Sequence, residues 1–388
     1  MPSSACVSVI IPTFNRAGFL RESLTSVLAQ TRPPLEVIVV DDGSSDETPA
    51  VVQGFGRDVV YVRKDNGGKA AAINLALPRA RGDYLWFFDD DDVALPDSIE
   101  RRLGVLLARP ELGWIFSAYY FGVTGPNGEI VRGARKWLTV SSSRAVWVRL
   151  LMECFFPLQG CLVRRECFAE IGNFDESLWR SQDYDMLIRL AYRFKGTGID
   201  EPTFILRLHD DLRGPLAERH AVGSRRRIWS QYDRRIGRRI RQRFGLIDFM
   251  ESPRDASTAT AVDPRLALIR RAAVMASKGL IPEMISDCVE ASRIQTAPLR
   301  RPERLLCGRM LRFPYFWFAY GRDAPAFWHG VRSLNDTKVG REILMIHCAS
   351  LMHQAKSHDT PWTRRARYVS MALRILAECA LRGGGEGG

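Results

Sequence analysis

The sequence predicts an α/β protein with a mostly parallel central sheet, followed by a C-terminal α-helical, arginine-rich region. Short apolar runs recur near the N-terminus, and segments with helical spacing separate them, as in a sheet built of strand–helix–strand units. From about residue 224 the apolar residues follow helical spacing only. We therefore expect two domains, residues 1–215 and residues 216–388.

The first predicted strand, Val7 to Ile11, is a β-branched run typical of a buried strand. The other predicted strands, besides the one described next, are Leu35 to Val40, Val59 to Val62 and Leu158 to Val163. Helical spacing predicts helices from Phe19 to Leu28 and from Asn66 to Leu77. Crossovers between parallel strands are right-handed, which gives a doubly wound sheet.

The fourth predicted strand, Tyr84 to Phe88, leads directly into four aspartates, Asp89 to Asp92. The strand is short, aromatic and almost without polar residues, as in strands buried on both faces. Ligands bind at the carboxyl ends of strands in open α/β sheets. Four crowded carboxylates repel one another, and Mg²⁺ or Mn²⁺, which prefer oxygen ligands and also hold diphosphates, removes this conflict. An acidic surface turn is the alternative interpretation.

The amino-acid composition is that of a globular, basic protein. The 388 residues are 46% hydrophobic and 26% charged, which is ordinary for a globular protein. A net charge of +12 favours anionic partners such as nucleotides or phospholipid surfaces. No signal peptide is evident, no apolar stretch approaches the roughly 18 residues that span a bilayer, and the cysteines form no CxxC pair. We expect a cytoplasmic protein with reduced thiols.

Two phosphate-binding motifs are excluded. The P-loop pattern fails around Gly67-Gly68-Lys69, because Ala70 stands where Ser or Thr is needed. The Rossmann glycines are missing after the first strand, where the turn Pro12-Thr13-Phe14-Asn15 is expected. What remains is a nucleotide held at strand ends, with Asp42 accepting hydrogen bonds from a base and Lys69 reaching a diphosphate. Taken singly, Asp42 is equally explained as a helix cap and Lys69 as a solvated lysine.

Four motifs in this order and spacing resemble the inverting GT-A glycosyltransferases of family 2: VSVIIPTFNR, DDGSSDET, NGGKAAAIN and RGDYLWFFDDDDVALP. The resemblance continues through GCLVRRECFAEIGNFDESL and SQDYDMLIRLAYRF, and covers Val7 to His209. It implies a GT-A-like fold, a nucleotide-sugar donor with UDP as the expected nucleotide, Mn²⁺ or Mg²⁺, and inversion at the anomeric carbon. The QxxRW motif of processive relatives is absent, which implies one sugar added to a glycan, lipid-linked or other small acceptor.

Carried over by position, the resemblance assigns roles to individual residues. Asp42 resembles the residue that reads the base, Asp91 matches the metal-binding carboxylate, and His209 lies where relatives place a further metal or diphosphate ligand. A structural histidine is the alternative for His209. The expected donor-binding residues are Pro12, Thr13, Asn15, Asp42, Asn66, Lys69, Asp89 and Asp90.

Asp183 matches the catalytic base of the family, and the local sequence supports that role. Met186, Leu187 and Leu190 form an apolar helical face, so Gln182 and Asp183 fall in the first turn of a helix. A carboxylate at a helix N-terminus stays ionised, as a base must be before it accepts a proton. A simple helix cap is the alternative. Many relatives carry an acidic residue where Gln182 stands.

The segment from Ser224 to Gly245 holds nine arginines, with apolar residues every four positions, and is predicted to be a basic amphipathic helix. We expect it to meet an anionic membrane surface or lipid-linked acceptor, or else to pack its apolar stripe on the first domain with solvated arginines. Residues 251–264 are an expected linker and Gly383 to Gly388 an expected flexible tail. Helices with an aromatic cluster, Phe313 to Tyr320, are expected between them.

Two other functions remain open at this point. A nucleotidyltransferase would also use carboxylates and a metal, although the first loop is not glycine-rich. A non-catalytic module that binds a nucleotide or a membrane would not need Asp183. For the glycosyltransferase, we expect a cytoplasmic location or peripheral association with the inner face of the plasma membrane, and no nucleic-acid partner.

Overall fold

The computed structural model describes residues 5–126, 128–138, 142–209, 225–250, 263–357 and 360–383. The chain divides into an N-terminal unit, Met1–Leu150 with Cys154–Arg225, and a C-terminal unit, Leu151–Glu153 with Arg226–Gly388. The boundary expected at residue 215, nearly all of the expected linker at 251–264 and the tail after Gly383 lie outside the described residues.

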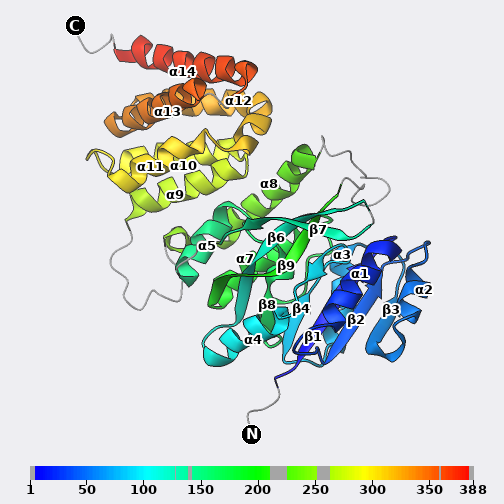
Figure 1. Ribbon diagram of the computed structural model, residues 1–388. Coiled ribbons are helices and arrows are strands. Elements are labelled where there is room, and N and C mark those ends of the chain that lie inside the picture. Colours follow the sequence, from blue (N-terminus) through cyan, green and yellow to red (C-terminus); the bar gives the residue numbers. More distant parts are fainter. Residues whose placement is uncertain are drawn as a thin grey trace. The chain divides into compact units, whose positions relative to one another are not determined.

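The N-terminal unit is built on one mixed sheet in the order β3-β2-β1-β4-β8-β6-β9-β5, with β7 pairing to β6 (Figure 1). The strands are β1 (Val7–Thr13), β2 (Glu36–Asp41), β3 (Val59–Arg63), β4 (Tyr84–Phe87), β5 (Val93–Ala94), β6 (Trp114–Thr124), β7 (Ile130–Lys136), β8 (Leu162–Arg164) and β9 (Gly196–Leu208). Strands β1 to β4 run parallel, and β8 is antiparallel to β4. The α/β fold class predicted from the sequence is confirmed.

Successive side chains of a strand point to opposite faces of the sheet, so the buried strands β1 and β4 place apolar side chains on both faces. Val9 and Trp86 share one core cluster with Leu20 of helix α1 (Ala17–Leu28) and Leu103 of helix α4 (Ser98–Ala108). The other helices of this unit are α2 (Thr48–Gln53), α3 (Lys69–Ala76), α5 (Ser143–Met152), α6 (Cys167–Ile171) and α7 (Gln182–Arg193). Because both faces are covered, the polar residues that follow the strands gather at the sheet's carboxyl edge.

Two element predictions are wrong in detail. Pro12 and Thr13, expected in a turn, are the last residues of β1. Pairing of β1 with β4 ends at Ile10, so the missing N–H of Pro12 costs no ladder hydrogen bond. The strand expected from Leu158 to Val163 is instead a single 3₁₀ turn, Leu158–Gly160, followed by β8. The Gly160 amide bonds back to the Pro157 carbonyl, which closes the turn.

The C-terminal unit is helical in its described part, which confirms the expected helical region. Its helices are α8 (Arg225–Arg243), α9 (Pro264–Ser277), α10 (Ile281–Ile294), α11 (Arg301–Met310), α12 (Pro314–Asn335), α13 (Lys338–Lys356) and α14 (Trp362–Gly383). From the aromatic cluster at Phe313 to Tyr320, Phe316 is buried and its ring contacts Tyr320 and Phe327. Among the described helices, none has the length and hydropathy needed to span a bilayer.

Part of the apolar stripe of α8 is buried: Ile236, Ile240 and Phe244 are at most 4% exposed. The interpretation that expected a packed stripe placed it on the first domain, with solvated arginines. The structure instead gives α8 contacts within the C-terminal unit, and several of its arginines are ion-paired. Arg234 pairs with Asp323 at 3.1 Å and Arg241 with Asp287 at 2.5 Å. This helix is therefore part of the packing of the C-terminal unit.

Candidate active site

Four aspartates follow β4 at the carboxyl edge of the sheet. Asp90, Asp91 and Asp92 are buried and Asp89 is partly buried. Burial raises the pKa of Asp89. Burial also raises the pKa of Asp90 to about 6, with the Asp91 charge adding to the effect and Arg16 opposing it. The cluster thus resists full ionisation unless cations lie close by.

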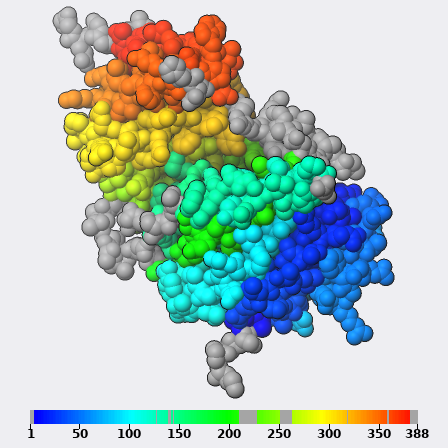
Figure 2. All heavy atoms as spheres, in the orientation of Figure 1, coloured from blue at the N-terminus to red at the C-terminus, as the bar shows by residue number. Residues whose placement is uncertain are grey.

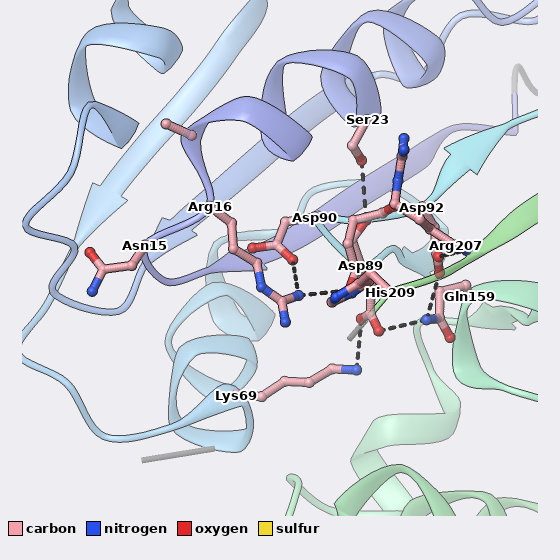
Figure 3. A network of polar contacts seen from close by, with 12 residues as sticks. Asn15, Arg16, Ser23, Lys69, Asp89, Asp90, Asp92, Gln159, Arg207 and His209 are labelled. Atoms are coloured by element: carbon pink, nitrogen blue, oxygen red, sulfur yellow. Dashed lines mark hydrogen bonds and ion pairs between the residues drawn. The ribbon is translucent and has the colours of Figure 1, made fainter. Parts of the chain in front are cut away.

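Two basic side chains, Arg16 and His209, meet Asp91 (Figure 3). Arg16, from the connection between β1 and α1, places Nη1 3.0 Å from Asp90 Oδ1 and 2.7 Å from Asp91 Oδ2. His209, just after β9, places Nε2 2.8 Å from the same Asp91 oxygen. The sequence prediction included His209 but missed Arg16. Arg16 could have been predicted from its position, because it directly follows Asn15 near the carboxyl end of β1.

Gln159 and Arg207 fix the orientation of the acidic segment from further along the chain. The Gln159 amide donates to Asp89 Oδ2 at 2.5 Å and to Asp92 Oδ2 at 2.9 Å. The backbone N–H of Arg207 donates to Asp92 Oδ1 at 2.9 Å, and its guanidinium pairs with Glu22. The 3₁₀ turn at Leu158–Gly160 is what brings Gln159 here. The sequence did not predict either residue as part of the site, because both are far from the aspartates in the sequence and meet them only in the folded chain.

The donor set of this cluster suits a divalent ion. Asp89, Asp91 and Asp92 each offer a carboxylate oxygen, and these oxygens lie within 4.8 Å of one another. Such hard oxygen donors match Mg²⁺ and Mn²⁺. The sequence prediction named Asp91 and His209 as metal ligands. The structure brings these two side chains together, and it places carboxylate oxygens of Asp89 and Asp92, but not of Asp90, in one group with Asp91.

Lys69 joins the acidic segment to the predicted base. Its Nζ lies 2.7 Å from Asp89 Oδ1 and 3.0 Å from Asp183 Oδ2. Burial alone would lower the pKa of Lys69, but the charges of Asp183 and Asp89 outweigh it and raise the pKa. Lys69 is therefore a fixed cation between two carboxylates that are 94 positions apart in the sequence.

Asp183 lies in the first turn of α7, as predicted. Ser181, the residue just before the helix, has the left-handed conformation at φ 59°, and its side chain makes no capping hydrogen bond. The other oxygen of Asp183, Oδ1, is buried and makes no hydrogen bond among the described residues. An unsatisfied buried oxygen is costly, and this one is available to accept a hydrogen bond from a ligand. The simple-cap alternative does not describe this carboxylate.

Asp42 holds the loop that leads into α3. Its Oδ1 accepts from the Gly67 amide at 2.9 Å and from Lys64 Nζ at 2.8 Å, and its Oδ2 accepts from the Gly68 amide at 2.7 Å. Gly68 has φ +90°, and a Cβ there would lie 2.8 Å from the Trp179 ring. Only glycine lets this loop deliver its amides to Asp42.

The remaining predicted donor-binding residues lie at the same edge. Pro12 and Thr13 end β1. The Asn15 side-chain oxygen accepts from the Ser45 amide at 2.7 Å, which ties the turns after β1 and β2 together. Asn66 donates to the Asp42 carbonyl at 3.0 Å. The sheet order reverses at β1, which pairs with β2 on one side and β4 on the other, and such switch points are where ligands bind.

Comparison with known proteins points to one family of enzymes. Residues 8–172 match the family model described as Glycosyl transferase family 2. This part of the chain is similar to that family. The matched range contains β1 to β4 and the acidic segment. Asp183, the predicted base, and His209, the second predicted metal ligand, lie beyond the matched range.

Curated relatives match about half of the chain. An uncharacterized glycosyltransferase of Rickettsia prowazekii (strain Madrid E) is 33% identical over 187 residues, which make up 47% of this chain and 58% of that protein. Chondroitin synthase of Pasteurella multocida (strain Pm70) is 27% identical over 208 residues, 53% of this chain and 21% of that protein. The chain spans between 27% and 65% of the length of the first three curated relatives.

Solved structures support the fold. TarS of S. aureus, residues 1–349 in complex with UDP, has a TM-score of 0.52 at 15% sequence identity, over 83% of this chain and 89% of that chain. At this identity the likeness shows the fold alone. The GT-A-like fold expected for the family 2 domain is confirmed.

Proposed function

We propose that the N-terminal unit is an inverting glycosyltransferase that moves one sugar from a UDP-sugar to a hydroxyl group of an acceptor. The observation that carries the proposal is the bridge from Asp89 through Lys69 to Asp183. It brings the acidic end of β4 and a carboxylate at the start of α7 within the reach of one side chain. The match of residues 8–172 to the model of Glycosyl transferase family 2 supports the reaction class.

The donor is proposed to bind at the carboxyl ends of β1, β2 and β4. Asp42 is the proposed partner of the base, and its carboxylate already accepts N–H donors at that edge. Lys69 is the proposed partner of the diphosphate. TarS, which shares the fold, is described in complex with UDP, so UDP is the nucleotide to test first.

Asp91 and His209 are proposed to hold Mn²⁺ or Mg²⁺, with Asp89 and Asp92 close enough to contribute. When bound, the ion neutralises the negative charge that develops on the leaving diphosphate. Arg16, which touches both Asp90 and Asp91, and Lys69 add fixed positive charge on the same edge. Fixed charges of this kind stabilise a transition state without reorganising during the reaction.

Asp183 is proposed to be the general base. It takes the proton of the acceptor hydroxyl while that oxygen bonds to the anomeric carbon and the bond from this carbon to the diphosphate oxygen breaks. One displacement inverts the configuration. Oδ2 of Asp183 is held by Lys69, and Oδ1, which has no hydrogen bond among the described residues, is the proposed proton acceptor.

The acceptor is proposed to be a glycan, a lipid-linked or another small molecule that receives one sugar. The proposed location is the cytoplasm, with peripheral association at the inner face of the plasma membrane. The basic net charge of +12 supports an anionic surface as partner. Neither statement is needed for the reaction itself.

Replacing Asp183 tests the proposal. Asp183→Asn keeps the size and one hydrogen-bond acceptor for Lys69 but removes the base, so transfer should fall by roughly a hundredfold or more. Asp185→Asn is the matched control, because Asp185 lies in the same turn and pairs with Arg189 at 2.9 Å. Single-turnover transfer and UDP calorimetry are measured together. A loss within about threefold, below what a general base supplies, would instead favour a nucleotide-binding module or another base.

A further inference from the structure

Helix α14 ends the described chain, and one of its faces packs into the C-terminal unit. Met371, Ala372 and Ile375 are at most 5% exposed. The helix lies beside α13 and α12 (Figure 1). One buried apolar face of this kind is what an ordinary amphipathic helix has.

The opposite face of α14 is also apolar, and it is exposed. Trp362 is 79% exposed, Leu373 58% and Leu376 38%. The exposed alanines of the helix are Ala366, Ala377 and Ala380. With 3.6 residues per helical turn, these positions fall on the same side of α14, so they form one stripe along the helix. A helix that is apolar on two faces normally has a partner on each of them.

Charge decides which partner fits this stripe. Helix α14 contains five arginines and a single acidic residue, Glu378. Arg364, Arg367 and Arg374 are exposed. Arg374 lies over the Trp328 ring at 4.1 Å, which holds its charge at the flank of the helix. An exposed Trp–Leu stripe bordered by arginines is the pattern of helices that lie in the interface of an anionic bilayer.

A second copy of the chain is a poorer match. Two stripes facing each other would bring Arg367 and Arg374 near the same residues of the other copy, on a chain with net charge +12. The arginine-rich helix α8 is a poorer match as well. Its apolar residues Ile236 and Ile240 are buried, so they have no face to offer to lipid.

We propose that the exposed stripe of α14, formed by Trp362, Leu373 and Leu376 and bordered by Arg367 and Arg374, docks on an anionic phospholipid surface. Figure 2 shows the atoms of α14 in red as part of the surface of the C-terminal unit. The assignment deepens the proposed membrane location, but it depends on no step of the sugar transfer. Failure of one therefore does not imply failure of the other.

Vesicle sedimentation of the full chain tests the assignment without donor or acceptor. The protein should sediment with vesicles of phosphatidylcholine and phosphatidylserine, less so as salt is raised, and far less with phosphatidylcholine alone. The double variant Leu373→Glu, Leu376→Glu should weaken binding by about tenfold or more. Leu107→Glu, at a leucine of α4 that is 49% exposed, is the matched control and should bind like the unchanged protein.

Arg367→Glu provides a second variant that leaves the apolar stripe intact, and it should weaken binding to anionic vesicles only. Thermal melts and UDP binding should be unchanged in all three variants, which separates docking from folding and from donor binding. Equal sedimentation of the double variant and the unchanged protein would overturn the assignment. So would a concentration-dependent dimer that the double variant abolishes, because it would give the stripe to a second copy.

Discussion

At the scale of single residues, Lys69 links two carboxylates of the candidate site. It has one carboxylate on each side, Asp89 and Asp183, and all three side chains are about a quarter exposed. Burial opposes its charge, yet the two anions raise its pKa. The ammonium group therefore stabilises two carboxylates that would otherwise repel each other.

Lys69→Met should lower the free energy of unfolding by about 1–3 kcal/mol without metal, because it removes the cation that Asp89 and Asp183 share. Added Mg²⁺ should stabilise this variant more than the unchanged protein, since the ion supplies the missing positive charge. Urea unfolding with and without Mg²⁺ measures both effects. Lys195→Met, at an exposed lysine of the same unit, is the control. Identical unfolding of the two variants would show that the bridge does not stabilise the fold.

At the scale of elements, a buried ion pair joins α9 to α11. Arg265 and Glu303 are at most 1% exposed and lie 2.8 Å apart. Burial alone would raise the pKa of Glu303, but hydrogen bonds from Arg265 and Arg300 outweigh it and lower the pKa to about 2. A carboxyl group with a lowered pKa stabilises the fold above its unfolded pKa and loses that contribution as the pH falls toward its folded pKa.

Glu303→Gln should therefore lower the free energy of unfolding at pH 7 by about 3–5 kcal/mol, because it leaves Arg265 buried without a counter-charge. The difference from the unchanged protein should shrink as the pH falls from about 4.5 toward 2, where Glu303 itself becomes protonated. Glu290→Gln, whose side chain is 59% exposed and 3.9 Å from Arg271, should change stability by at most about 1 kcal/mol. A pH-independent difference would contradict the assignment.

The elements that the sequence predicts well are those with a local signal. The β-branched and aromatic runs of β1, β2 and β4 carry their own burial pattern, and acidic residues after a strand must lie at its end. The 3₁₀ turn at Leu158–Gly160 has no such signal, because its apolar residues fit a strand equally well. Gln159 and Arg207 reach Asp92 across 67 and 115 positions, so their roles depend on a tertiary fold that periodicity does not encode.

At the scale of the whole molecule, every predicted site residue belongs to the N-terminal unit, and the proposed lipid-docking stripe belongs to the C-terminal unit. A ligand of one unit stabilises that unit by mass action. The two proposals therefore differ in which part of the protein each ligand should stabilise.

UDP with Mn²⁺ or Mg²⁺ should stabilise the N-terminal unit by about 2.7 kcal/mol when the nucleotide is at a hundred times its Kd. Chelation of the metal should remove most of this gain, and so should Asp91→Ala. Asp58→Ala, at an exposed aspartate of the same unit, should keep it. Scanning calorimetry and titration calorimetry with and without chelator measure the effect. Equal UDP affinity in both conditions would sink the metal assignment.

The hydrogen bonds of Asp42 have a consequence for cooperativity. Its two oxygens already hold the amides of Gly67 and Gly68, and the next residue is Lys69. In the proposed donor complex, a uracil ring that donates its N–H to Asp42 would compete with those amides, so it would change how firmly the backbone before Lys69 is held. Binding free energies are reciprocal between coupled sites. We therefore expect occupation of the proposed base subsite to alter the affinity of the acidic edge for its cation by the same factor as the cation alters the affinity for the base.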